Sequence, residues 1–113
     1  MLVPARGDVY LADLDPVRGR EQAGVRPVVV ISVNLFNKGP GDLAVVLPIT
    51  SKKRGILWHV EVNPPEGGLR LSSYIKCEDI RSISRDRLGR RLGQVATRTM
   101  LAVEDRIRIL LEL

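Results

Sequence analysis

Residues 27–33 read Pro-Val-Val-Val-Ile-Ser-Val (PVVVISV), an almost uninterrupted run of β-branched apolar residues. Strands that are covered on both faces show such continuous runs, whereas half-exposed strands alternate apolar and polar residues. β-Branched side chains also favour strands over helices. The run therefore predicts a strand that is buried on both faces and lies near the centre of a sheet.

Short apolar segments on either side of this run, separated by glycine and proline, predict further strands. These are expected at 8–13, which alternates; at 43–49, which is apolar and stops at Thr50; at 58–62, which is half-exposed; and at 73–77 and 79–83. Turns and loops are expected at 14–24, 34–41 (with a short helical bend), 51–55 and 63–70. In the last of these loops, two prolines and two glycines argue against regular structure.

The pattern changes to a helical period near the C-terminus. Apolar residues recur at Met100, Val103, Ile107, Leu110 and Leu111, with charged residues between them. This spacing predicts an amphipathic helix between Ala96 and Leu113, with Thr97 or Thr99 as its N-terminal cap. Six or so short strands followed by one helix favour a mainly β fold, a partly open barrel with the helix over one end. A chain of 113 residues has room for one domain, 1–113.

Composition excludes several classes of protein. The chain has one cysteine, Cys77, and one histidine, His59, so an intramolecular disulfide and a zinc cluster of the finger type are both excluded. A pair of histidines, the usual acid and base of a ribonuclease, is also excluded within one subunit. No apolar run is long enough to cross a membrane, and the N-terminus does not resemble a signal peptide, so we expect a cytoplasmic protein.

Positive charge predominates and is concentrated locally. The net charge is +5, which favours a polyanionic partner such as nucleic acid. The segment RSISRDRLGRR at 81–91 holds five arginines and one aspartate, and a second basic cluster, Lys52, Lys53 and Arg54, follows Thr50. Aromatic residues make up 4% of the chain, so RNA binding would depend on pockets and phosphate contacts instead of stacking. The alternative for the segment 81–91 is a solvated turn that aids solubility.

Polar residues at the ends of the buried strands form the candidate site. Arg26 enters the central strand from a polar loop that carries Glu21 and Gln22, and Thr50 ends another buried strand. A guanidinium and a hydroxyl at such places can bind a phosphate whose negative charge grows in a transition state. The alternative is a structural ion pair between Arg26 and Glu21 or Glu78.

The remaining special residues have simpler interpretations. Trp58 is expected in the core or at a dimer interface. His59 follows it in the alternation and is expected to face solvent, while Cys77 is expected to be a small core residue without a nucleophilic role.

Several motifs together resemble the MazF/PemK (Kid) family of toxin endoribonucleases, and the resemblance covers nearly the whole chain. They are RGDVYLADLDPVRGREQAGVRPVVVIS at 6–32, the Asn37 that follows, LPITS at 47–51 and KCEDIRSISRDRLG at 76–89. Within the first motif, the run G-x-EQ-x-G-x-RP-V-x-V-I-S is the most specific to the family.

The resemblance implies a fold, a reaction and partners. The fold would be a CcdB-like, SH3-type barrel with a C-terminal helix, in a homodimer. The reaction would be cleavage of single-stranded RNA at short sequence motifs without a metal or other cofactor. The RNA 2′-hydroxyl would attack its own phosphorus and leave a 2′,3′-cyclic phosphate and a 5′-hydroxyl. The partner would be a MazE-like antitoxin whose acidic, disordered tail competes with RNA for the basic groove.

The resemblance also assigns roles to individual residues. Arg26 and Thr50 match the catalytic arginine and threonine, and Glu21 matches a glutamate beside that arginine. Lys76 and Glu78 fall where some members place residues with acid–base roles. RNA contacts are implied for Gln22, Asn37, Ser51, Lys52, Lys53 and Arg54.

Two other functions fit the same fold. CcdB-like proteins poison gyrase through a C-terminal tail that contains tryptophan, but this chain ends Leu-Leu-Glu-Leu and has only Trp58. A regulatory barrel that binds RNA without cutting it would keep the basic face.

Overall fold

In the computed structural model, the described residues are 3–15, 19 and 24–113. The elements follow one another as β1 (Asp8–Asp13), β2 (Val25–Val30), α1 (Asn34–Asn37), β3 (Leu43–Thr50), β4 (His59–Val62), η1 (Glu66–Gly68), β5 (Ser73–Lys76), β6 (Arg81–Ser84), η2 (Arg85–Arg87), β7 (Leu88–Gln94) and α2 (Thr97–Leu111). The elements labelled η are single turns of 3₁₀ helix.

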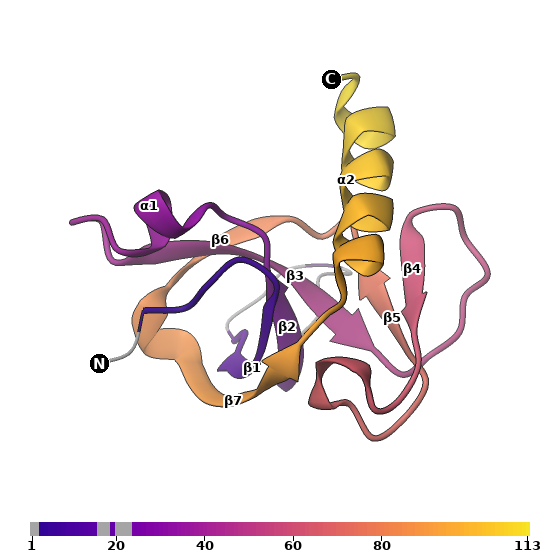
Figure 1. Cartoon of the computed structure of the whole chain (residues 1–113), viewed down its shortest axis with the longest axis horizontal. Helices are drawn as coiled ribbons and strands as arrows, with labels where there is room; N and C mark the ends of the chain where they lie inside the picture. The colour runs from indigo at the N-terminus through magenta and orange to yellow at the C-terminus, as the bar shows by residue number, and fades with distance from the viewer. Residues whose placement is uncertain (1–2, 16–18, 20–23) are drawn as a thin grey trace.

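Seven strands of the described chain form a strongly bent antiparallel sheet that does not close (Figure 1). The strand order is β4-β5-β3-β2-β1-β7, and β6 pairs with β3 outside this path. β3 is long enough to pair with three strands: its first half pairs with β6, its middle with β2 and its end with β5. The prediction of a mainly β, partly open barrel with a C-terminal helix is therefore confirmed.

β2 lies between β1 and β3, and its residues 28–30 are covered on both faces, as predicted from the apolar run. The predicted continuation to Val33 is wrong, because the strand ends at Val30 and Val33 is 59% exposed. Val28 and Val30 point into a core formed with β1, β3 and β6, while Val29 points into a second core on the opposite face. All three side chains are fully buried. Because successive residues of a strand face opposite sides, only a strand between two cores requires apolar residues at every position.

α2 packs its buried residues Met100 and Val103 against the second core, which also contains Val60 of β4 and Ile75 of β5. From there the helix projects away from the strands (Figure 1). The predicted threonine cap is wrong, since the residue before the helix is Ala96 and no side chain of the helix caps it. The carboxylate of Glu66 in η1 instead accepts hydrogen bonds from the Ala96 N–H, at 3.0 Å, and from the Thr99 hydroxyl.

The segment 63–70 also departs from the prediction, because it contains the 3₁₀ turn η1. This turn lies against β7, backbone to backbone: a Cβ atom at Gly68 would lie 2.0 Å from the Leu92 carbonyl oxygen, and one at Gly93 would lie 2.7 Å from the Gly67 carbonyl carbon. Gly68 also has a φ of +69°, in the left-handed region. Glycine at both positions thus allows η1 and β7 to touch.

β7 was not predicted: its first residues belong to the basic segment 81–91, for which the sequence left a nucleic-acid contact and a solvated turn as the alternatives, and no strand was expected at 88–94. It pairs with β1 along the open edge of the sheet, with irregularities in the register between Val9 and Ala12. Among the described residues, no helix has the length and apolar character needed to cross a membrane.

Candidate functional site

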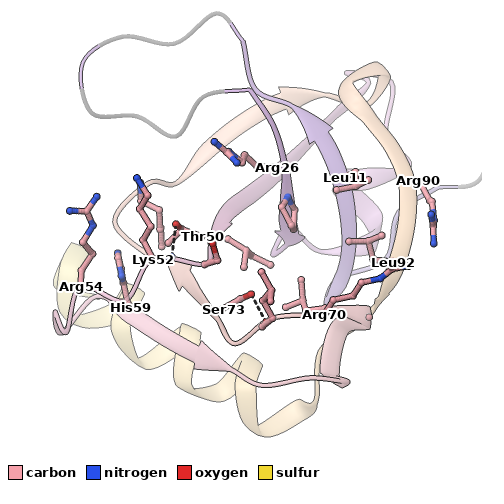
Figure 2. Close-up of a pocket in the computed structure, with 17 residues that line it drawn as sticks. Leu11, Arg26, Thr50, Lys52, Arg54, His59, Arg70, Ser73, Arg90 and Leu92 are labelled. Carbon is pink, nitrogen blue, oxygen red and sulfur yellow. Dashed lines mark hydrogen bonds between the residues drawn. The ribbon is translucent and has the colours of Figure 1, made fainter.

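A cavity of about 610 Å³ opens between β1, β2 and β7 on one side and β3, β4 and β5 on the other (Figure 2). It is lined by Leu11, Arg26, Pro27, Ile49, Thr50, Ser51, Lys52, Arg54, His59, Gly68, Leu69, Arg70, Leu71, Ser73, Lys76, Arg90 and Leu92. Several of the polar residues lie at strand ends, and the η1 turn contributes Gly68 to the lining.

Arg26 and Thr50 lie on neighbouring strands at the same edge of the cavity. The pairing of β2 with β3 stops at Val28 and Pro48, and Arg26 and Thr50 each lie two residues beyond that last pair, where the cavity begins. Arg26 pairs there with Ala12 of β1, and Thr50 with Tyr74 of β5. Both side chains line the cavity and are labelled in Figure 2. The structure thus brings together the two residues to which the sequence assigned the central roles.

The Thr50 hydroxyl is oriented by its own loop. Its Oγ1 accepts a hydrogen bond from the Lys52 N–H at 3.2 Å. A hydroxyl that accepts one bond still has a hydrogen to donate. Pro27 follows Arg26 directly, and its ring restricts the backbone of both residues. The guanidinium and the hydroxyl are therefore two donors carried on restrained backbone.

Positive charge dominates the cavity wall. Six lining residues are cationic: Arg26, Lys52, Arg54, Arg70, Lys76 and Arg90. No carboxylate is among the described lining residues. Cations that converge on a concave surface raise the local concentration of anions and bind phosphate groups. The site is therefore built for a polyanion.

The predicted acid–base residues lie at one side of the cavity. Lys76 lines it with a half-buried side chain whose Nζ is 4.0 Å from Asp79 Oδ2. Glu78 lies outside the lining and binds His59, with 3.0 Å between Oε2 and Nε2. The expectation that His59 faces solvent is wrong, since its side chain is 5% exposed and forms part of the cavity wall.

Of the other predicted RNA contacts, Ser51, Lys52 and Arg54 line the cavity, and Lys53 is exposed beside it without lining it. Glu21 and Gln22 lie outside the described residues.

Asn37 does not belong to the site, which corrects the predicted RNA contact. Its side chain is completely buried. Its Nδ2 donates to the carbonyl oxygens of Pro4 and Ser32, both at 3.0 Å, and its Oδ1 accepts from the Ser32 hydroxyl. With these bonds the amide joins the N-terminal segment to the turn after β2, so its role in the fold is structural.

The basic segment 81–91 is not a continuous basic face. Arg81 pairs with Asp79, Arg85 with Asp42, and Arg91 with Asp8. Arg87 donates to the carbonyl oxygens of Asp13 and Asp15. Of the five arginines, only Arg90 lines the cavity. Most of this charge therefore serves to tie strands and loops together.

Sequence reasoning missed Arg70 and Arg90 as individual site residues, and it missed His59 and Ser73. Arg70 ends the loop after η1, and Arg90 lies in the unpredicted strand β7. The local signal for Arg90 was the basic segment itself, but nothing in it distinguishes Arg90 from its neighbour Arg91.

Cys77 is a core residue, as predicted. Burial raises the pKa of its thiol to about 12, so the nucleophilic thiolate is suppressed at neutral pH. Within the described part of the chain, no group of three or more histidine, cysteine, aspartate or glutamate side chains is placed to hold a metal ion.

Comparison with known proteins finds a matching family model and relatives over nearly the whole chain. A family model described as "PemK-like, MazF-like toxin of type II toxin-antitoxin system" matches residues 5–111. An endoribonuclease MazF of Staphylococcus saprophyticus is 41% identical over 110 residues, 96% of this chain and 91% of that protein. The endoribonuclease EndoA of Bacillus subtilis is 35% identical over 113 residues, 99% of this chain and 97% of that protein.

Solved structures show the same fold. The crystal structure of MazF from Deinococcus radiodurans superimposes with a TM-score of 0.89 at 26% identity and covers 100% of both chains. A MazE–MazF complex from the same organism gives a TM-score of 0.82 at 26% identity over 100% of this chain and 99% of that chain. From its sequence and its fold, this chain belongs to the family of PemK-like, MazF-like toxins of type II toxin–antitoxin systems.

Proposed function

We propose that this chain is the toxin of a type II toxin–antitoxin system and acts as an endoribonuclease, with the cavity beside Arg26 and Thr50 as its active site. The observation that carries the proposal is the convergence of six cationic side chains, Arg26 among them, on a cavity that also holds the Thr50 hydroxyl. The relatives named endoribonucleases support it, because they match this chain over nearly its full length.

The reaction that fits these residues is transesterification within single-stranded RNA. The 2′-oxygen forms a bond to the adjacent phosphorus while the bond from phosphorus to the 5′-oxygen breaks. The 2′-hydroxyl gives up a proton and the leaving 5′-oxygen receives one, which yields a 2′,3′-cyclic phosphate and a 5′-hydroxyl. The phosphorane between them carries more negative charge than the ground state, so donors placed around it accelerate the reaction.

Arg26 and Thr50 are the groups that stabilise the phosphorane. The guanidinium offers several N–H donors in a planar fork that matches phosphate oxygens, and the Thr50 hydroxyl adds a further hydrogen bond. Because positive charge is supplied by arginine and lysine, the reaction requires no metal ion. Glu21 and Glu78 are the candidates for accepting the 2′-hydroxyl proton.

Other polar residues of the cavity and of the segments beside it in the sequence bind the RNA chain. Ser51, Lys52, Lys53 and Arg54 lie beside Thr50 and contact phosphates on one side of the scissile bond, and Gln22 and Lys76 supply further polar contacts. Arg70 and Arg90 extend the cationic wall on the opposite side (Figure 2). Cleavage at a defined sequence motif follows if bases enter the spaces between these groups.

The biological setting follows from the family. Residues 1–113 act as one toxin domain, assembled as a homodimer in the cytoplasm, where messenger RNA is available. A cognate MazE-like antitoxin with an acidic tail inhibits the toxin by occupying the cationic cavity. Solved complexes of relatives are described as an endoribonuclease with its cognate antitoxin and as MazE–MazF.

The test uses the purified protein and a long RNA of mixed sequence in EDTA. We expect discrete fragments with 5′-hydroxyl and 2′,3′-cyclic phosphate ends, and no cleavage of an RNA that carries deoxyribose at the mapped site. Arg26→Ala is expected to lower the cleavage rate by at least about 100-fold. Arg98→Ala removes the same charge from an 87% exposed side chain on α2 and is the control, with an unchanged rate.

Two results would overturn the proposal. Cleavage at a deoxyribose site would exclude the 2′-hydroxyl as the nucleophile. Binding of RNA without any fragment, under conditions where the chain is folded by circular dichroism, would identify a regulatory barrel instead.

A further inference from the structure

His59 and Glu78 form a close pair at the edge of the cavity, and the proposed function has not yet used the histidine. His59 Nε2 lies 3.0 Å from Glu78 Oε2. The His59 side chain is 5% exposed and lines the cavity, whereas the Glu78 side chain is 32% exposed. The pair therefore has a buried member in the cavity wall and a member that ligands can reach.

Both members are carried on restrained backbone. His59 begins β4 and pairs with Lys76 of β5. The ladder continues past Lys76, because the Cys77 N–H donates to the Trp58 carbonyl oxygen at 3.1 Å. Glu78 follows this bond directly. A hydrogen bond between side chains on such a scaffold holds its geometry more precisely than one between loops.

The surroundings specify how the imidazole is protonated. An ionised carboxylate only accepts hydrogen bonds, so His59 Nε2 must carry a hydrogen. His59 Nδ1 is buried and has no hydrogen-bond partner among the described residues. A hydrogen on Nδ1 would be a buried donor without an acceptor, which is costly. The neutral ring with its hydrogen on Nε2 is the form that fits.

We propose that His59 is a positioning residue for RNA cleavage: its Nε2–H holds Glu78 at the cavity edge, and Glu78 accepts the 2′-hydroxyl proton. This inference rests on the proposed function and deepens it by choosing between the two candidate bases. A carboxylate held through one oxygen keeps its second oxygen for the substrate. Ordering the side chain before RNA binds also removes an entropic cost from the reacting complex.

The charged groups around the pair are mainly positive. Lys76 faces His59 across the strand pair, and Arg54 lines the same part of the cavity. From α2, Arg106 donates to the Leu57 carbonyl oxygen at 2.8 Å, two residues from His59. Two acidic neighbours have partners of their own: Asp79 pairs with Arg81 and Lys76, and Glu61, on the same face of β4 as His59, accepts a hydrogen bond from Asn63. The neighbouring Cys77 stays protonated, since its pKa is about 12.

Kinetics on three variants test the role. His59→Phe keeps a buried ring and removes the donor; we expect kcat to fall about 100-fold with KM within about threefold of the wild type. His59→Gln keeps a donor near the Nε2 position without an imidazole, and we expect kcat to return to within about tenfold of the wild type. Glu78→Gln is expected to match His59→Phe in kcat and to lose the acid limb of the pH–rate profile. His59→Gln keeps that limb.

The single histidine permits a second measurement that is independent of activity. Long-range ¹H–¹⁵N spectra of the imidazole, recorded where the ring is neutral, report which nitrogen carries the hydrogen. We expect the form protonated at Nε2 in the wild type and a mixture of both forms in Glu78→Ala. Because Glu78 is partly exposed, this variant is expected to fold even if His59→Phe does not.

The inference is overturned if His59→Phe retains the kcat and pH profile of the wild type, or if the wild-type ring carries its hydrogen on Nδ1. These outcomes differ from a failure of the proposed function. That failure would show as cleavage at a deoxyribose site or as wild-type activity in Arg26→Ala, whatever the imidazole spectra show.

Discussion

Arg90 and Arg91 are neighbours in β7, yet their side chains lie in different surroundings. Arg90 lines the cavity, while Arg91 donates to Asp8 Oδ1 at 3.1 Å on the other face of the strand. The structure therefore predicts that Arg90→Gln weakens RNA binding through lost phosphate contact and that Arg91→Gln does not. The two variants change net charge equally, so each is the control for the other.

The magnitude follows from the number of cavity cations. If each of the six neutralises one phosphate of a single strand, the logarithm of the binding constant falls against the logarithm of salt concentration with a slope of about −4. Affinity then drops about 300-fold between about 50 mM and about 200 mM salt. Removing Arg90 makes the slope shallower by about 0.7, so the same drop becomes about 130-fold. Arg91→Gln leaves the slope unchanged.

Fluorescence anisotropy with a 2′-O-methyl RNA measures the binding constant at each salt concentration without cleavage, because that RNA lacks the nucleophile. Urea unfolding of both variants checks that the fold persists; a glutamine at position 91 can still donate to Asp8. The reasoning is refuted if Arg91→Gln changes the slope as much as Arg90→Gln, or if the wild-type slope is shallower than about −2, since the cavity cations would then not carry the binding.

Two further residues give predictions that separate stability from catalysis. Asn37→Ala removes a buried amide with three hydrogen bonds and is expected to lower the free energy of unfolding in urea by about 2–3 kcal/mol, while the cleavage rate per folded molecule stays the same. If Asn37→Ala is as stable as the wild type but cleaves RNA at different sites, Asn37 contacts RNA after all. The Cys77 thiol, with a pKa of about 12 in the folded chain, is expected to resist iodoacetamide at about pH 8 until urea unfolds the protein. The pKa of this thiol is 9.0 in the unfolded chain and about 12 in the folded chain, so the free energy of unfolding is expected to decline as pH rises between these two values. Cys77→Ala is expected to lack this part of the decline. An equal decline in the wild type and in Cys77→Ala would contradict the burial of the thiol.

Elements with a strong local pattern were predictable from sequence. Val28 to Val30 are apolar because both faces of β2 are covered, and Met100 and Val103 repeat at the helical period because α2 has one buried face. In both elements the pattern of apolar residues that predicts burial lies within a few turns or residues of the same element. Pattern and structure therefore agree within a few residues.

β7 was unpredictable for a physical reason. Its half-buried residues Leu88 and Leu92 are separated by Gly89, Arg90 and Arg91, and register irregularities with β1 break the two-residue period. Its strand character comes from pairing with β1, about 80 residues earlier in the chain. A local pattern carries no information on such a partner.

The same distinction applies to the site. Arg26 and Thr50 were candidates because each lies at an end of an apolar strand, and it was the resemblance to the MazF/PemK family that gave them catalytic roles. Arg70, Arg90 and His59 join them only through the folding of η1, β7 and β4 around the cavity. The RNA contact at Asn37 was implied by the resemblance alone, and the local sequence does not show that its amide is the buried donor to the carbonyl oxygens of Pro4 and Ser32.

The contact between η1 and β7 constrains the evolution of this protein. Main chain touches main chain at Gly68, which lines the cavity, and at Gly93, so neither position can accept even a methyl group without separating the two segments. No side chain is intermediate in size between glycine and alanine, so neither position can change gradually. A substitution at either one has to move η1 away from β7, and the part of the cavity wall that Gly68 forms moves with it.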